Sequence, residues 1–179
     1  MNLQKESPLS TEDISAFFGD VFEASEGSDE GQLIAGFVHS LLLRTPERDI
    51  RLFTARDEGR LIGAICLSRM TYPDDPRDVF MLSPVAVATE AQGKGIGKRL
   101  ITTGLDALKD EGISYAITYG DPAYYARCGF AQITEDFAKA PLALSQPQGW
   151  LGQPLGQTGN SPFKGTPTCV KALNNTALW

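Results

Sequence analysis

The sequence predicts one mixed α/β domain in which helices flank a central sheet. Two amphipathic helical segments come first, two strands joined by tight-turn residues follow, and a strand–helix–strand unit comes next. The length of 179 residues suits a single domain over residues 1–179. A content of 42% hydrophobic and 21% charged residues is ordinary for a globular protein and argues against a disordered or fibrous chain.

Two helices are expected near the start of the chain. Ser10 and Asp13 have the spacing of a capping box, and an apolar stripe from Ile14 to Phe22 follows them. A second helix is expected from about Asp29 to Leu43, before the Thr45-Pro46 stop.

Strands are expected at residues 51–55 and 61–67, with hairpin-turn residues at 57–60 between them. A third strand is expected at residues 79–88. Pro84 lies inside it and removes one donor from the ladder, so it predicts a bulge, an edge or a place where neighbouring strands part.

A helical stripe then runs from Ile96 to Leu108, and Gly112 follows its end. Residues 115–119 are expected to form a strand. A short helix should begin at Asp121-Pro122, with Asp121 as its N-cap and proline in the first turn.

The tail has a different composition. Residues 147–167 hold five glycines and four prolines, which predicts a long irregular loop and excludes a helix or a central strand. A last strand is expected within residues 167–173. We therefore divide the chain into a core of about 1–135 and an extension over 136–179.

Several protein classes are disfavoured by composition. A net charge of −6 does not suit nonspecific nucleic-acid binding. The longest apolar run, residues 33–43, is too short to span a membrane, and residues 1–20 lack the pattern of a secretory signal. One histidine and the absence of a C-x-x-C pattern argue against a metal site. An odd number of widely spaced cysteines fits a reducing, cytoplasmic compartment.

The strongest chemical signal is the segment Gln92-Gly93-Lys94-Gly95-Ile96-Gly97-Lys98, which follows a strand and opens a helix. Glycines there let the backbone approach a ligand, and the free N–H groups of a helix start favour an anion. Lys94, Lys98 and Arg99 add positive charge. The segment predicts a pyrophosphate site, and the alternative is a glycine-rich turn without a ligand.

Three ligand classes compete for this loop. The glycines at 93, 95 and 97 do not match a G-x-G-x-x-G dinucleotide fingerprint, and Asp110 and Glu111 lie at a helix end rather than after a second strand. A Walker A loop fails because Gln92 replaces its first glycine and Arg99 its hydroxyl residue. The Gln-x-x-Gly-x-Gly spacing resembles the coenzyme A pyrophosphate loop of the GNAT acetyltransferases.

A second segment supports this resemblance. Tyr125 to Phe130 is similar to the Tyr-x-x-x-Gly-Phe ending of that family, and the order of helices and strands also agrees. The resemblance covers about residues 1–135 and points to a bacterial branch of predicted N-acetyltransferases. It implies a GNAT-like acyl-CoA N-acyltransferase fold, a mixed central sheet with splayed strands flanked by helices.

The resemblance also implies where acetyl-CoA would bind. The loop backbone from Gln92 to Gly97, with Lys98, would hold the pyrophosphate, and Leu82 or Ser83 would supply the N–H that polarises the thioester carbonyl. The residues implied to pair with the pantetheine amides are Val85, Ala86 and Val87.

Tyr125 would be the general acid that protonates the leaving thiolate, because a phenol pKa near 10 resembles that of an alkyl thiol. The alternative is a ring that only packs on the sheet. Tyr124 is expected to pack or to wall the substrate site. Thr118 and Asp121 stand where many family members carry Asn and Ala, so this chain lacks the Asn side chain that contacts the coenzyme in those members.

A general base is not evident from the sequence. Glu30 and Asp78 are candidates, each set against the alternative of a solvated charge, and His39 is expected to be only a helix residue. Cys128 would permit an acyl-cysteine route, but the family reacts by direct attack in a ternary complex.

The resemblance therefore implies an acetyl-CoA-dependent N-acetyltransferase, an enzyme of the acyltransferase class, acting on a primary amine of a small molecule or peptide. A non-catalytic acyl-CoA sensor and a nucleotide-binding protein are the alternatives. The acidic chain is compatible with a polyamine, an aminoglycoside-like compound or a lysine side chain. The acyl-chain preference stays open, as does the oligomeric state, for which a homodimer is one option.

We expect Trp150, Phe163 and Trp179 to dock the tail on the core. The alternative is that they form a wall of the acceptor site.

Overall fold

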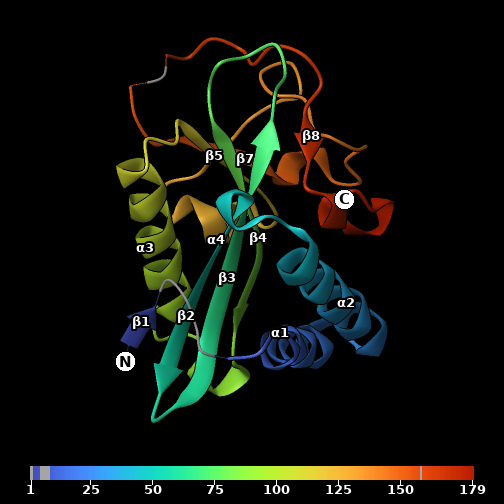
Figure 1. Cartoon of the computed structure of the whole chain (residues 1–179), viewed down its shortest axis with the longest axis vertical. Coiled ribbons are helices and arrows are strands. Elements are labelled where there is room, and N and C mark those ends of the chain that lie inside the picture. Colours follow the sequence, from blue (N-terminus) through green and yellow to red (C-terminus); the bar gives the residue numbers. More distant parts are fainter. Residues whose placement is uncertain (1, 5–8, 158) are drawn as a thin grey trace.

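The computed structural model describes residues 2–4, 9–157 and 159–179, and a mixed sheet runs through its centre (Figure 1). Over these residues, eight strands join in the order β1-β2-β3-β4-β5-β7-β6, and β8 pairs with β3. Within the described sheet, β4 and β5 form the one parallel pair. The strands are β1 (Asn2–Gln4), β2 (Ile50–Asp57), β3 (Arg60–Thr71), β4 (Val79–Val87), β5 (Tyr115–Tyr119), β6 (Ala131–Gln132), β7 (Trp150–Pro154) and β8 (Thr168–Cys169).

Helices cover both faces of this sheet. α3 lies on one face, whereas α1 and α2 lie on the other (Figure 1). The helices are α1 (Thr11–Glu26), α2 (Ser28–Arg44), α3 (Ile96–Asp110) and α4 (Pro122–Ala126). No helix within the described ranges has both the length and the apolar character needed to cross a membrane.

The side chains of β3 show why the sheet needs two layers of helices. Ala64 and Cys66 pack into the cluster under α1 and α2, whereas Ile65 and Leu67 pack into the cluster under α3. Because successive side chains of a strand point to opposite faces, this apolar run is buried on both sides. The fold class predicted from the sequence is confirmed.

Two of the predicted helix starts, those of α1 and α4, are confirmed by their caps. Ser10 and Asp13 form the capping box of α1: the Asp13 backbone N–H donates to Ser10 Oγ over 3.1 Å, and the Ser10 N–H donates to Asp13 Oδ2 over 3.2 Å. The Asp121 carboxylate accepts from the Ala123 N–H over 2.9 Å and caps α4.

Pro84 marks the place where two strands part. β4 pairs with β5 from Val79 to Leu82, and beyond Leu82 it pairs only with β3 over the described residues. At the last paired position, the Thr118 hydroxyl donates to the Leu82 carbonyl over 2.8 Å. The splayed sheet expected from the sequence is therefore present.

The prediction of an irregular loop over residues 147–167 is wrong for residues 150–154. These residues form β7, which lies between β5 and β6. Glycines in this strand and directly before it serve close packing: a Cβ on Gly152 would lie 2.6 Å from the Tyr115 ring, and one on Gly149 would lie 2.9 Å from the Gly120 carbonyl oxygen. The strand expected within 167–173 is limited to β8, and residue 158 lies outside the described residues.

The tail is anchored by aromatic side chains, as expected from the sequence, and also by the charged side chain of Arg77, which the sequence analysis did not single out. Trp150 is fully buried, and its Nε1 donates to the Ala138 carbonyl over 2.8 Å. The Arg77 guanidinium lies 3.6 Å from the centre of the Phe163 ring and 2.7 Å from Asp75 Oδ2, and it donates to the Ser161 carbonyl. Arg77 therefore joins the loop before β4 to the loop after β7.

We expect Arg77→Ala to lower the free energy of unfolding by about 3 kcal/mol, because it leaves a buried carboxylate without its partner. The Asp75 side chain is only 3% exposed. Chemical denaturation measures the effect. Arg48→Ala is the matched control, since that side chain is 82% exposed, and an equal loss in both variants would contradict the assignment.

The same pair sets an acid limit on stability. Arg77 lowers the pKa of the Asp75 carboxyl to about 2, below its usual value of 3.8. A lowered folded-state pKa contributes stability above the unfolded value, and this contribution is lost as the pH falls through the folded value. The stability difference between wild type and Arg77→Ala should therefore shrink between about pH 4 and pH 2.

Candidate functional site

A cavity of about 1290 Å³ opens where β4 and β5 part. Its walls come from the α1–α2 pair, the second half of β4, the loop before α3, the β5–α4 segment and the tail. Segments far apart in the sequence thus meet at the gap that Pro84 predicted.

The glycine loop forms one wall of this cavity. Gly93 and Gly95 have φ angles of 74° and 76°, which favour glycine. Apart from their own chain neighbours, no described residue places a heavy atom within 4 Å of the Cβ position at either glycine. Gln92 lines the cavity, but its Nε2 donates to the Val87 carbonyl over 3.1 Å. The Gln92 side chain therefore ties the loop to the end of β4.

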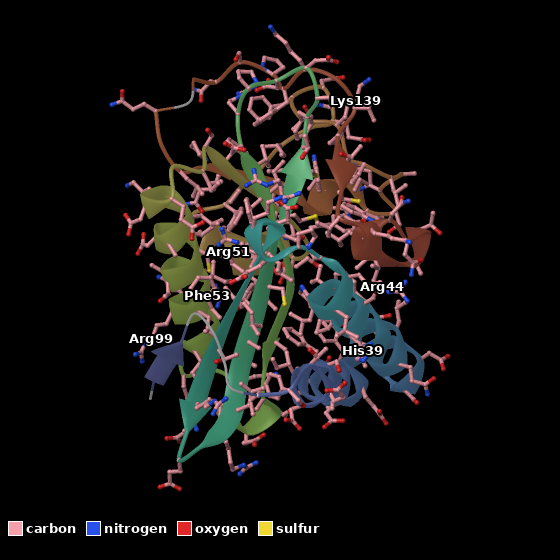
Figure 2. All side chains as sticks on the ribbon, in the orientation of Figure 1. His39, Arg44, Arg51, Phe53, Arg99 and Lys139 are labelled. Atoms are coloured by element: carbon pink, nitrogen blue, oxygen red, sulfur yellow. The ribbon has the colours of Figure 1, made fainter. Side chains whose placement is uncertain are left out.

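The start of α3 is suited to an anion. Among the residues that the structure describes, no side chain caps this helix. Its first turn holds no acidic residue, whereas the first turns of α1 and α2 each hold two. Lys98 lines the cavity, and the exposed Lys94 and Arg99 are not among its lining residues; Figure 2 labels Arg99 near this end of α3. The free N–H groups and Lys98 together fit a phosphate or pyrophosphate.

The open edge of β4 forms the floor of the cavity. Ser83, Val85 and Val87 line it, whereas the side chains of Leu82 and Ala86 are buried. Leu82 and Ala86 could therefore contribute to a ligand site only through their backbone groups. The edge without a strand partner can offer such groups to an extended ligand.

Tyr125 lies at the same gap, held by the short helix α4. A Cβ on Gly120 would lie 2.8 Å from the Tyr125 ring, so glycine there lets the ring pack on the backbone. Burial raises the pKa of Tyr125 to about 12, and a hydrogen bond with Thr118 partly opposes this effect. The value near 10 expected from the sequence is too low, and the phenol keeps its proton throughout the neutral range.

Tyr124 and Cys128 line the cavity beside it. A Cβ on Gly97 would collide with the Tyr124 hydroxyl, so Tyr124 reaches from α4 to the first turn of α3. The sequence analysis missed this contact, although a glycine in the first turn of a helix is a signal of close approach. Burial raises the pKa of the Cys128 thiol, with Lys98 and Arg127 opposing, so Cys128 is not an activated thiolate.

Of the two carboxylates considered as the general base, Glu30 lines the cavity and Asp78 does not. Glu30 lines the cavity at the start of α2, next to Glu26 at the end of α1. Asp78 is not a lining residue, and its Oδ1 accepts from Arg69 over 2.6 Å. His39 also lies outside the lining residues, on α2 and 3.8 Å from Glu12 (Figure 2).

Thr118 and Trp179, which the sequence analysis also named, both lie near this site. Thr118 is buried and does not line the cavity, so its hydroxyl orients Leu82 and Tyr125 rather than facing a ligand. Trp179 docks on the core through its Nε1, which donates to the Leu173 carbonyl over 2.9 Å, and it also lines the cavity. Across the described residues, no group of three or more His, Cys, Asp or Glu side chains could hold a metal ion.

Comparison with known sequences gives a family. The model of the acetyltransferase (GNAT) family matches residues 12–130. The chain is 33% identical over 136 residues to the uncharacterized N-acetyltransferase YjhQ of Escherichia coli K12. The aligned region makes up 70% of this chain and 75% of YjhQ. It is 34% identical over 79 residues to the uncharacterized N-acetyltransferase YhbS of the same strain. That aligned region makes up 44% of this chain and 47% of YhbS.

Solved structures share the fold. The complex of Escherichia coli YhbS with CoA has a TM-score of 0.77 at 22% identity, over 98% of this chain and 92% of that one. A GNAT family acetyltransferase from Brucella melitensis in complex with acetyl-CoA has a TM-score of 0.69 at 23% identity, over 97% of both chains. Because the family model matches residues 12–130 and YjhQ aligns with 70% of this chain at 33% identity, the chain belongs to the acetyltransferase (GNAT) family.

Proposed function

We propose that the protein is an acetyl-CoA-dependent N-acetyltransferase that acts on a primary amine. One observation carries the proposal: a single cavity joins an uncapped helix start, an unpaired strand edge and the protonated phenol of Tyr125. Acetyl-CoA supplies an activated acetyl thioester with a thiol as leaving group. Family membership and the CoA and acetyl-CoA complexes of YhbS and the Brucella protein support this choice of coenzyme.

The coenzyme would occupy the α3 side of the cavity. The backbone N–H groups of Gly93 to Gly97, with Lys98, would bind the pyrophosphate. The backbone of Val85 to Val87 on the open edge of β4 would pair with the pantetheine amides, as a neighbouring strand would. The N–H of Leu82 or Ser83 would polarise the thioester carbonyl.

The chain would then supply proton management for a direct attack. The amine nitrogen forms a bond to the acetyl carbon while the carbon–sulfur bond breaks. Glu30, directly or through water, takes the proton that the ammonium must lose, and Tyr125 gives its proton to the leaving thiolate. Both substrates bind together in this scheme, because Cys128 is a neutral thiol and no acyl-cysteine is needed.

The alternative function is a sensor that binds acyl-CoA without turnover. One observation favours it: a Tyr125 pKa of about 12 lies above that of an alkyl thiol, so the proton is less readily given up. Both functions require coenzyme binding, and only the enzyme releases thiol when an amine is present. For either function we propose a cytoplasmic location, since Cys66, Cys128 and Cys169 are free thiols.

We expect acetyl-CoA to bind with a dissociation constant in the micromolar range, and NAD and ATP to bind far more weakly. Isothermal titration calorimetry of the full chain measures all three. Lys98→Ala should weaken acetyl-CoA binding about tenfold, because it removes a charged contact to the pyrophosphate. If no binding of acetyl-CoA is measured, both the enzyme and the sensor are ruled out.

We expect Tyr125→Phe to lower kcat for thiol release about 100-fold, with acetyl-CoA affinity unchanged, because only the proton donor is removed. Tyr115→Phe is the matched control, since Tyr115 is buried on the same sheet outside the cavity lining. The Tyr125 phenol should stay protonated to about pH 11 in the free protein, given its pKa of about 12. An alkaline loss of kcat/KM centred below pH 10 that disappears in Tyr125→Phe would contradict this assignment.

We expect Glu30→Gln to lower kcat/KM for the amine about tenfold or more at neutral pH, because the ammonium loses its proton acceptor. Asp29→Asn makes the same charge change one residue away on α2, at an exposed position outside the cavity lining. Steady-state thiol release at saturating acetyl-CoA compares the two variants. Equal rates in both would remove Glu30 from the mechanism.

A further inference from the structure

The cavity has two ends with different chemistry. Around Tyr125 and the α3 start, the lining side chains pack into the cluster on the α3 face of the sheet. On the opposite face, lining side chains from α1, α2, β5 and the tail pack into the other cluster. The first end is the proposed coenzyme site, so the second end, called the far end below, is where an acceptor would enter.

The far end is walled mainly by apolar groups. Phe22, Ile34 and Phe37 come from the two N-terminal helices, and Leu178 and Trp179 come from the tail. The Trp179 ring stacks on Tyr119 with 6.0 Å between the ring centres. These surfaces favour an apolar body of about the size of an arene or a short alkyl chain.

Hydroxyl and amide groups at the far end already bond to protein groups. The Tyr119 hydroxyl accepts from the Gln146 N–H over 2.7 Å and shares a hydrogen bond with the Ser145 hydroxyl. The Ser25 hydroxyl faces the carbonyls of its own helix, and the Gln148 amide donates to Gln146 Oε1. A ligand rich in hydroxyl groups would find few free partners among them.

Two carboxylates at the far end differ from these groups. Glu26 and Glu30 flank the turn between α1 and α2, and neither has an ion-pair or hydrogen-bond partner within the part of the chain that the structure describes. The cations that line the cavity, Lys98 and Arg127, belong to the loop–α3 and α4 walls. The far end therefore offers negative charge beside an apolar wall.

We infer that the acceptor is a small primary amine with one cationic group on an apolar body. This inference rests on the proposed function. The ammonium binds at Glu26 and Glu30, and the body packs against Phe22, Phe37 and Trp179. A polyamine brings several cations, and an aminoglycoside brings several cations and hydroxyls. The apolar wall would remove water from these groups without supplying partners.

The test compares four amines at saturating acetyl-CoA by thiol release from the full chain. They are 2-phenylethylamine, spermidine, the aminoglycoside kanamycin and a peptide with one internal lysine. The expected kcat/KM for 2-phenylethylamine exceeds that for each of the other three by about tenfold or more, since a few buried carbon groups discriminate by this factor.

Two variants connect this preference to the far end. Phe22→Ala should lower the ratio of kcat/KM for 2-phenylethylamine to that for ethylamine about tenfold, whereas a loss of general stability would lower both values equally. Glu26→Gln should raise KM for both amines several-fold with kcat nearly unchanged. Glu23→Gln is the control, because Glu23 is exposed one turn earlier on α1 and outside the cavity lining.

The outcomes separate the inference from the proposed function. If acetyl-CoA binds and spermidine, kanamycin or the peptide is the best acceptor, the enzyme stands and the apolar monoamine is overturned. Acetyl-CoA binding without thiol release from any of the four amines also overturns it, as does a Phe22→Ala ratio equal to that of wild type. If acetyl-CoA does not bind, the proposed function fails first and the acceptor inference fails with it.

Discussion

The site depends on the separation of β4 from β5 beyond Leu82. Inside a sheet, backbone N–H and C=O groups need partners, and an edge left without them is costly unless something else pairs with it. Here β5 takes β7 as its partner on the other side, while β3 holds β4 in place. The unpaired edge of β4 therefore remains available to a ligand, and the cavity forms along it.

Two packing devices hold the walls of that gap apart. α1 and α2 approach so closely that a Cβ on Gly31 would lie 2.8 Å from the Gly19 carbonyl oxygen, which fixes the turn that carries Glu26 and Glu30. On the other side, Arg77 and Trp150 anchor the tail, so that Trp179 reaches the cavity. An extension rich in glycine and proline thereby becomes part of the site.

Most helices and strands could be predicted because their signals lie in neighbouring residues. The features that were not predicted depend on contacts between residues far apart in the sequence. The capping box at Ser10 and the proline at 84 act through neighbouring residues, so a single sequence contains them. β7 was missed because the need for Gly152 comes from the ring of Tyr115, 37 positions earlier. Asp78 is not a suitable base, because Arg69 donates a hydrogen bond to its carboxylate and the residue does not line the cavity. The high pKa of Tyr125 comes from burial of the ring, which cannot be deduced from the neighbouring sequence.

Helix starts with opposite first-turn charges give the cavity its direction. The first turn of α2 carries Asp29 and Glu30, whereas the first turn of α3 carries Lys98 and, over the described residues, has neither an acid nor a side-chain cap. The first arrangement attracts a cation and the second an anion. A molecule with an ammonium group and one with a pyrophosphate would thus enter from different sides and meet near Tyr125, which has no net charge of its own to disturb either. Orientation of the two substrates would then follow from the opposite side-chain charges of these two first turns, which the helices hold in place before either substrate binds.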